Sequence, residues 1–294
     1  MASLPSMNIE PLVGPCFIII WLSFILYGLV LAQVYFYFTT YEDHVLLKLA
    51  VALLCTMETL QVAACIHFVY TYLIVFFGNA GGLDIILWSI ILAIFLEVFI
   101  NILVQSFYIT RIWRLYRNVP LLIYLLSLLV VCTVLGFRAC ALPALQGTWQ
   151  ATQASPPYQR DVIASLSLRV LFDASITLIL TWIMSRQLSF AHKRSIKKIV
   201  HSLMFYGLGV GGVTTITTTI TLILLLTSST PLNYGGMIIV MSKVYANSMM
   251  ALLNIRKGIK NKAFSDDRFT LELTNVPRHG GDLVQQAVRA VLQW

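Results

Sequence analysis

Long runs of apolar residues alternate with short polar links along most of the chain. Seven of these runs reach the roughly 20 residues that a helix needs to cross the hydrocarbon core of a bilayer. They lie at 15–38, 46–71, 84–109, 119–142, 162–185, 199–227 and 235–256. The pattern predicts an all-α fold: a polytopic membrane protein built as a seven-transmembrane-helix bundle.

The flanks and links predict no further folded domain. We expect residues 1–14 to be a short extracellular segment, 15–256 to form the transmembrane domain, and 257–294 to be a poorly ordered polar tail in the cytosol. The proline-containing link at 143–161 is expected to be a solvated loop. In the sixth run, Gly207 and Gly211 form a GxxxG pattern, which lets a second helix approach closely.

Positive charge is concentrated in alternate links. Links rich in lysine and arginine stay in the cytosol, so the distribution predicts an N-terminus outside the membrane and a cytosolic C-terminus. The outer links contain only Arg160 as a basic residue. We expect the inner links to contact anionic lipid headgroups and to suit a cytosolic signalling partner. The residues expected to make these contacts are Arg111, Arg114, Arg117, Lys193, Arg194, Lys197 and Lys198.

Composition favours a membrane protein over a soluble enzyme or a nucleic-acid-binding domain. The chain is 59% hydrophobic and 11% charged, whereas soluble domains carry about 25% charged residues. The net charge of +8 comes from the inner links, so it indicates topology and not a nucleic-acid site. We expect the lipid bilayer as the main partner, in the plasma membrane or another membrane of the secretory pathway.

Metal, cofactor and disulfide chemistry is not predicted. The five cysteines all lie in apolar runs, without a CxxC pair. His67 shares its helix face with no second histidine and no cysteine placed as a metal ligand.

A second set of polar residues lies inside the apolar runs, where each charge costs at least about 2.5–3.5 kcal/mol unless it is paired or hydrated. The charges balance, because Glu58, Glu97 and Asp173 stand against Arg138, Arg169 and Lys243. The i, i+4 spacing of Arg169 and Asp173 predicts an ion pair between them. The candidate ligand-binding residues are Glu58, Gln61, Glu97, Asn101, Asp173, Lys243 and Asn247.

Two interpretations fit this polar set. In the first, the groups pair across helices and only specify packing. In the second, they line an outward-facing polar cavity that binds a small molecule. Polar residues at similar depth on four predicted helices exceed what packing usually needs, and we therefore carry the cavity forward as the functional hypothesis.

Sharper chemistries are weaker alternatives. A lysine in the seventh run facing a carboxylate in the third is what a retinal Schiff base requires, but Lys243 is predicted to lie in the outer half of its helix. A cyclase acting on a lipid or isoprenoid needs carboxylic acids in an apolar cavity, and Arg169 and Lys243 would favour their ionised forms. The sequence also lacks the inverted repeats of a transporter and the filter loop of a channel.

One group of motif residues is distinctive, above all the ending formed by Lys243, Tyr245, Asn247, Ser248, Leu253, Asn254 and Arg256. Earlier members are Gly14, Pro15, Leu26, Tyr27, Gly28, Gln33, Tyr35, Tyr37, Glu58, Thr59, Gln61, Gln105, Phe107, Arg111, Ile112 and Asp173. In these residues the chain resembles, over about 12–257, a family of basidiomycete fungal seven-transmembrane proteins of unknown function.

The resemblance implies a receptor-type seven-helix membrane protein and carries over no ligand, activity or catalytic residue. The run ITRIWRLY after the third segment lacks the Asp/Glu-Arg-Tyr motif of common G-protein-coupled receptors, and the seventh segment lacks NPxxY. We therefore expect a receptor- or sensor-like protein, not an enzyme, with a membrane-embedded enzyme on a lipid or isoprenoid as the alternative.

Overall fold

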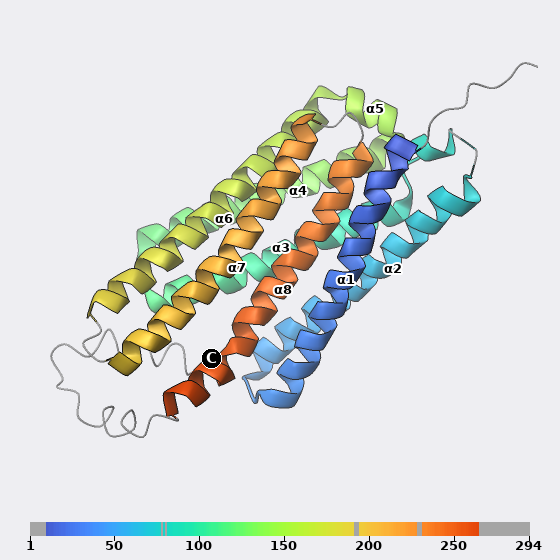
Figure 1. Cartoon of the computed structure of the whole chain (residues 1–294). Coiled ribbons are helices and arrows are strands. Elements are labelled where there is room, and N and C mark those ends of the chain that lie inside the picture. The colour runs from blue at the N-terminus through green and yellow to red at the C-terminus, as the bar shows by residue number, and fades with distance from the viewer. Residues whose placement is uncertain (1–9, 78, 80, 191–193, 228–230, 265–294) are drawn as a thin grey trace, which may run out of the picture.

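The computed structural model describes residues 10–77, 79, 81–190, 194–227 and 231–264, and side chains within 17–77, 79, 81–186, 209, 211–227 and 234–256. The regular structure of these residues is helical, as predicted (Figure 1). The α-helices are α1 (Glu10–Thr40), α2 (Val45–Tyr70), α3 (Trp88–Leu115), α4 (Val119–Gln146), α5 (Trp149–Ala154), α6 (Pro156–Phe190), α7 (Arg194–Thr227) and α8 (Pro231–Phe264). Two short helices, η1 (Thr71–Val75) and η2 (Gly82–Asp84), link α2 to α3.

Six helices in the described part of the chain have the length and hydropathy of membrane spans. They cover Phe17–Thr40, Val45–Val75, Trp88–Leu115, Val119–Gln146, Pro156–Arg186 and Tyr234–Arg256. Within α7, Gly211–Thr227 is a shorter apolar helix. The chain is therefore an integral membrane protein, while the seventh span and the orientation in the membrane stay predictions. Most of the predicted tail, 265–294, lies outside the described residues.

Local signals place several helix ends. At the start of α2, Nδ1 of His44 accepts a hydrogen bond from the backbone N–H of Leu46 (3.3 Å). Asn118 caps α4 in the same way by accepting from Leu121 N–H (3.1 Å). Gly147 ends α4 with a φ of 73°, a left-handed conformation that glycine adopts without steric cost. These caps satisfy backbone groups that the helix itself leaves unpaired.

The link at 143–161 is not the solvated loop that we expected, because α5 folds back onto the neighbouring α2–α3 link. The indole of Trp149 is buried, and its Nε1 donates to the hydroxyl of Tyr72 (3.2 Å). The backbone N–H of Gln150 donates to Oδ1 of Asp84 (2.8 Å). A buried indole combines a large apolar surface with a satisfied N–H, so it holds α5 in place. We call this end of the bundle the α5 end (Figure 1).

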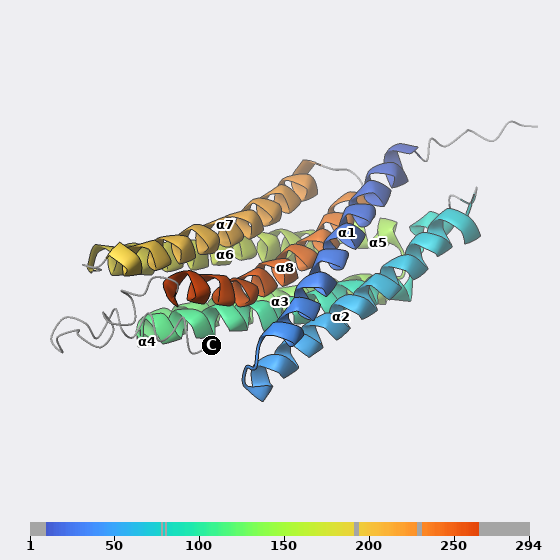
Figure 2. The same cartoon turned by 60° about the horizontal axis from the view of Figure 1, so that its bottom comes forward.

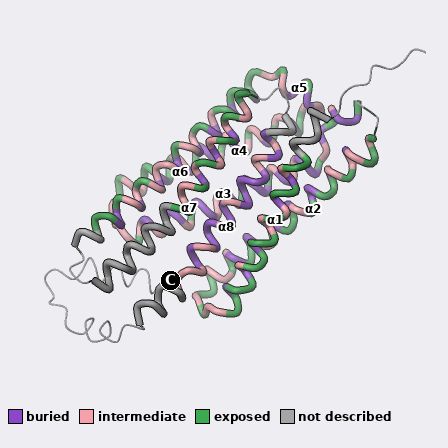
Figure 3. Tube along the Cα trace, in the orientation of Figure 1, coloured by how far each residue is buried: buried purple, intermediate pink, exposed green. Residues whose placement is uncertain are grey.

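Helix α8 is the central helix. Figures 1 and 2 show it with α1 on one side and α7 on the other, and it also packs on α3. Buried positions concentrate along it (Figure 3), and its core face contains Met241, Tyr245, Met249 and Leu253. Their spacing of four residues keeps them on one face of the helix. The other faces of α8 also pack against neighbouring helices, so this helix has little contact with lipid.

The outer faces of α1, α2 and α4 carry the opposite pattern. Figure 3 shows many exposed positions along these helices. The large apolar residues exposed on them include Ile18, Trp21, Ile25, Leu29, Leu49, Leu53, Leu60, Ile123, Val130 and Val134. Monomeric soluble proteins rarely expose contiguous apolar patches larger than a few hundred Å². These faces are the lipid-contacting surface of the protein.

Candidate functional site

Lys243 on α8 and Glu58 on α2 form an ion pair in which both side chains are completely buried. Nζ of Lys243 donates to the Glu58 carboxylate and to Oε1 of Gln61 (2.7 Å). The same Gln61 oxygen accepts from the Ser242 hydroxyl (2.8 Å), and Nε2 of Gln61 donates to the backbone carbonyl of Ala93 on α3 (3.0 Å). Three predicted site residues thus form a closed cluster that joins α2, α3 and α8.

Arg169 on α6 and Glu97 on α3 form the second buried ion pair. Each guanidinium Nη atom donates to one carboxylate oxygen, with Nη2 to Oε2 at 3.2 Å. Nδ2 of Asn101, one turn along α3, donates to Oε1 of the same carboxylate (2.6 Å). Gly136 on α4 lies beside this pair, and a Cβ there would be in ordinary van der Waals contact with Nη2 of Arg169, at 3.5 Å. The two-point geometry holds both side chains in one orientation.

The predicted ion pair between Arg169 and Asp173 is not the pair that the structure forms. Arg169 reaches across to Glu97, whose carboxylate matches its planar fork. Asp173 instead accepts hydrogen bonds on Oδ2 from the hydroxyls of Thr218 on α7 (2.9 Å) and Tyr245 on α8. Those two hydroxyls lie 3.2 Å apart. Asp173 therefore ties α6, α7 and α8 together.

Asparagine side chains connect α8 to α1 at two levels. Nδ2 of Asn247 donates to the carbonyl of Leu26 (2.9 Å), and Nδ2 of Asn254 donates to the carbonyl of Gln33 (2.8 Å). Both donors and both acceptors are seven residues apart, so the two helices run parallel in register over two turns. We call this pair of contacts the asparagine ladder. It gives Asn247 a packing contact, whether or not this residue also binds a ligand.

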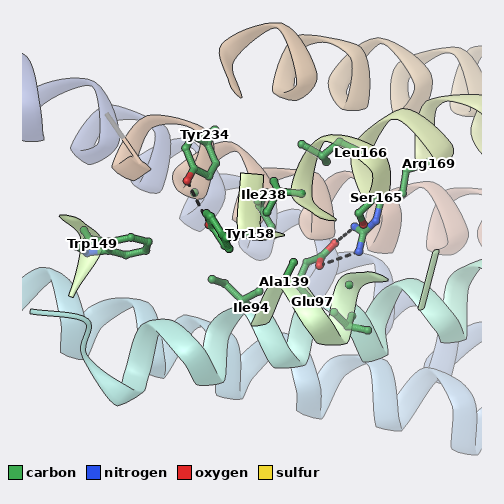
Figure 4. A pocket seen from close by; sticks show the side chains of 14 residues that line it. Ile94, Glu97, Ala139, Trp149, Tyr158, Ser165, Leu166, Arg169, Tyr234 and Ile238 are labelled. Carbon is green, nitrogen blue, oxygen red and sulfur yellow. Dashed lines mark hydrogen bonds and ion pairs between the residues drawn. The ribbon is translucent and has the colours of Figure 1, made fainter. Parts of the chain in front are cut away.

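A cavity of about 50 Å³ lies among α3, α4, α6 and α8, next to α5 (Figure 4). Glu97 and Arg169 line one end of it, and Trp149, Tyr158 and Tyr234 line the other. Between these ends the walls are apolar apart from Ser165: Ile94, Val98, Gly136, Ala139, Val162, Leu166, Gly235 and Ile238. The site therefore combines one neutralised ion pair with an apolar chamber.

Only one of the seven predicted ligand-binding residues, Glu97, lines this cavity. Asn101 holds the carboxylate of Glu97 through its amide. Glu58, Gln61 and Lys243 form their own cluster. Asp173 and Asn247 make the interhelical contacts described above. The predicted polar residues therefore do not form one site in the structure. They belong to several separate clusters of contacts between helices.

Four polar or aromatic residues that line the cavity were named in no sequence-based prediction: Trp149, Tyr158, Ser165 and Tyr234. The hydroxyls of Tyr158 and Tyr234 lie 3.2 Å apart, and both rings are buried. Aromatic residues near the ends of membrane helices usually mark the headgroup region, so their positions in the sequence point to lipid. A lone serine in an apolar run likewise gives no signal of its own, because its hydroxyl can bond to its own helix backbone.

At the end of the bundle opposite α5, Arg256 of α8 pairs with Asp43 in the α1–α2 link. Nη1 donates to Oδ1 (3.2 Å), and the hydroxyl of Tyr37 donates to Oδ2 (2.9 Å). Burial alone would raise the pKa of Asp43. The hydrogen bonds from Arg256 and Tyr37 and the positive charges of Arg256 and Lys48 outweigh it and lower this pKa. The aspartate is therefore held in its ionised form near neutral pH.

The predicted basic contacts are described only in part. Arg114 and Arg117 are exposed near the end of α3, and Arg111 is half-buried. Lys193 lies outside the described residues. Three further predicted contacts fall in the part of α7 whose side chains are not described: Arg194, Lys197 and Lys198. Binding of lipid headgroups or a cytosolic partner by these residues stays a prediction.

Among the cysteines whose side chains the structure describes, Cys55, Cys65, Cys132 and Cys140, none forms a disulfide bond. Within the same described ranges, no three histidine, cysteine, aspartate or glutamate side chains are grouped so that they could hold a metal ion.

Comparison with known proteins adds one similarity. A family model described as "Family of unknown function (DUF6534)" matches residues 169–258. The match begins at Arg169 and includes Asp173, α7 and Lys243. No curated protein and no solved structure matches the chain. The region from α6 to α8 is thus similar to a domain of unknown function, while a basidiomycete origin and a resemblance that extends toward residue 12 stay predictions.

Proposed function

We propose that this integral membrane protein is a seven-helix receptor- or sensor-like protein, with the α5 end outside the cell and the opposite end in the cytosol. The single observation that carries the proposal is the cavity beside the Glu97–Arg169 pair. A chamber with apolar walls and a few convergent polar groups is the usual form of a small-molecule site. The positive-inside rule supports the orientation, which puts the cavity near the outer surface.

The ion pair gives a route by which a bound molecule changes the bundle. Glu97 and Arg169 connect α3 to α6, and both helices continue to the opposite end of the bundle. From Glu97 to the end of α3 at Leu115 the helix runs about 27 Å, at about 1.5 Å per residue. A ligand that alters the pair shifts the relative position of two rigid helices, and the displacement reaches the links at the cytosolic end.

The same geometry makes enzymatic or retinal chemistry a weaker alternative. A cyclase needs an acid that can give its proton to the substrate, but the one carboxylate that lines the cavity, Glu97, is engaged on both oxygens by Arg169. A retinal Schiff base needs a lysine in the chamber. Lys243 is instead completely buried against Glu58 and Gln61. Product analysis of membranes that contain the protein tests the enzymatic alternative.

The coupling step can be tested without knowing the ligand. The double variant Glu97→Gln with Arg169→Gln removes both charges together, so neither is left unpaired in the membrane. We expect increased hydrogen–deuterium exchange over residues 112–121, which contain the α3–α4 link and the adjoining helix ends, in the full-length protein in lipid nanodiscs. The matched control is Arg138→Gln with Asp161→Asn, which removes the ion pair at the α5 end. It should change exchange only near that end.

The proposal fails if exchange in the Glu97/Arg169 double variant changes only around the cavity. It also fails if the control variant affects residues 112–121 equally, because the response would then report general loosening of the bundle.

A further inference from the structure

The two charges that line the cavity neutralise each other, so neither is available to balance the charge of a ligand. Both Nη atoms of Arg169 donate to Glu97, and the carboxylate also accepts from Asn101. The pair is neutral as a whole. Burying a charge without a partner in a membrane interior costs several kcal/mol. A molecule that enters with the ion pair intact is therefore uncharged.

An uncharged polar group in the cavity is available to such a molecule. Ser165 lines the chamber beside Arg169 (Figure 4), and its side chain is more than nine-tenths buried. No hydrogen bond to its hydroxyl is formed within the part of the chain that the structure describes. A serine hydroxyl can both donate and accept a hydrogen bond, so at the cavity wall it can bind a hydrogen-bonding guest.

The opposite end of the chamber offers a second, weaker polar point. The hydroxyls of Tyr158 and Tyr234 bond to each other (3.2 Å), which leaves one of the two O–H groups free to donate. Tyr158 and Ser165 are seven residues apart on α6, about 10 Å at about 1.5 Å per residue. Val162 lies between them on the same helix and is apolar. A guest therefore meets hydroxyl groups at both ends and an apolar wall between.

The cavity volume limits the size of the guest. One water molecule needs about 10–15 Å³ of such volume, so about 50 Å³ holds roughly four groups of the size of water. We infer that the cavity binds a small, uncharged molecule of about four to seven non-hydrogen atoms, apolar apart from one hydroxyl or carbonyl oxygen, with that oxygen at Ser165. This inference rests on the proposed function, because it names the ligand class of the same cavity.

A set of three photoreactive probes tests the charge of the ligand. The probes are butanol carrying a diazirine ring on its third carbon, and the butanoate and butylammonium of the same chain length. Each is photolysed with the full-length protein in nanodiscs, and the modified residues are mapped by mass spectrometry. We expect the alcohol to label cavity residues such as Val162 and Ile238. Excess 1-butanol should reduce this labelling by competition. The two charged probes should label lipid-facing residues only.

Two variants, each with a matched control, separate cavity labelling from labelling out of the bilayer. Ala139→Leu fills the chamber and should abolish cavity labelling, whereas Ala52→Leu makes the same change on the exposed face of α2 and should not. Ser165→Ala removes only the hydroxyl and should weaken competition by 1-butanol about three- to tenfold, the effect of one hydrogen bond. Ser175→Ala, ten residues further along α6, should leave it unchanged.

Equal or stronger cavity labelling by the butanoate or the butylammonium would overturn the assignment of an uncharged ligand. Labelling by the alcohol that is the same in the Ala139→Leu variant would mean that the probe does not bind in the chamber, and the inference would fall. These outcomes are independent of the exchange experiment on the Glu97/Arg169 double variant, which tests the transmission step alone. A bound alcohol without any change at residues 112–121 would refute the receptor role and preserve the ligand class.

Discussion

Lys243 has no exposed surface, and its ammonium group is satisfied by Glu58 and Gln61. The pair is not symmetrical in its hydrogen bonding. Oε1 of Glu58 has no hydrogen-bond partner among the described residues, so the carboxylate depends on the lysine for its compensation. In a membrane interior a charge that loses such a partner cannot turn to water. The two side chains act as a unit, and neither can be replaced alone without cost.

We therefore expect Lys243→Met to destabilise the protein by about 3–5 kcal/mol, the usual effect of leaving one charge of a buried pair behind. Adding Glu58→Leu should recover most of the lost stability, because no buried charge then remains unpaired. Thermal unfolding in detergent micelles, followed by the retention of monodisperse protein, measures both effects. A single variant as stable as the parent would show that the pair contributes nothing to folding.

Asp43 makes stability depend on acidity at the opposite end of the bundle. Its pKa in the folded protein lies below the ordinary value of 3.8, so the unfolded chain binds its proton first as the pH falls. The stabilisation is present in full above about pH 4 and is lost as the pH falls through the folded-state pKa.

The variant Asp43→Asn should lack this dependence. The difference in unfolding temperature between the parent and the variant should stay constant between pH 5 and pH 7 and shrink below about pH 4. A difference that grows on acidification would contradict the lowered pKa. Lys48→Gln is a milder comparison, because Lys48 acts on Asp43 only through its charge.

At the scale of elements, the asparagine ladder explains why α1 stays on α8. Polar contacts between membrane helices contribute about 0.6 kcal/mol on average and up to about 1.7. Asn247→Leu and Asn254→Leu should each destabilise the protein within this range. The two sites are about 10 Å apart, so their effects should add in the double variant. Chemical unfolding in mixed micelles tests the sum, and strong non-additivity would mean that the ladder breaks as one unit.

The sequence also predicted a close helix contact at the GxxxG pattern, and the described member of that pattern shows it. A Cβ on Gly211 would meet the side chain of Thr177 on α6, with Cβ of Thr177 at 3.2 Å. Gly211→Ala should therefore separate α6 from α7 and lower the unfolding temperature by several degrees. Thr177→Ala should recover part of the loss, because it removes the nearest oxygen. An unchanged unfolding temperature in Gly211→Ala would show that the two helices can separate without cost.

Helix positions followed from the sequence because a lipid-spanning helix needs a long apolar run, which is a local property. The partners of the buried charges did not follow from it. Which helices become neighbours depends on how their side chains pack, and the hydropathy pattern does not show this packing. Arg169 therefore has an acidic residue close by in sequence, Asp173, but forms its ion pair with a distant one, Glu97. The folding of α5 over the bundle was missed for a similar reason, since Trp149 becomes buried only through contacts with the α2–α3 link.

For the whole molecule, orientation is the prediction with the broadest consequences. We expect an epitope fused before residue 1 to be reached by antibody on intact cells, and one fused after residue 294 only after the membrane is made permeable. The charge difference between the links supplies the reason. If both epitopes lie on one side, the number of spans is even, and the α7 region does not cross the bilayer.

The central position of α8 also sets the order of events during synthesis. Glu58 is made 185 residues before Lys243, which at about 5–20 residues per second is roughly 10–40 seconds. During that interval α2 resides in or beside the membrane with a carboxylate that has no cation. The first half of the bundle must therefore remain loosely assembled, or be shielded by the insertion machinery, until the last helix arrives. We therefore expect a chain that stops short of α8 to lack the partner of Glu58 and to form a less stable bundle.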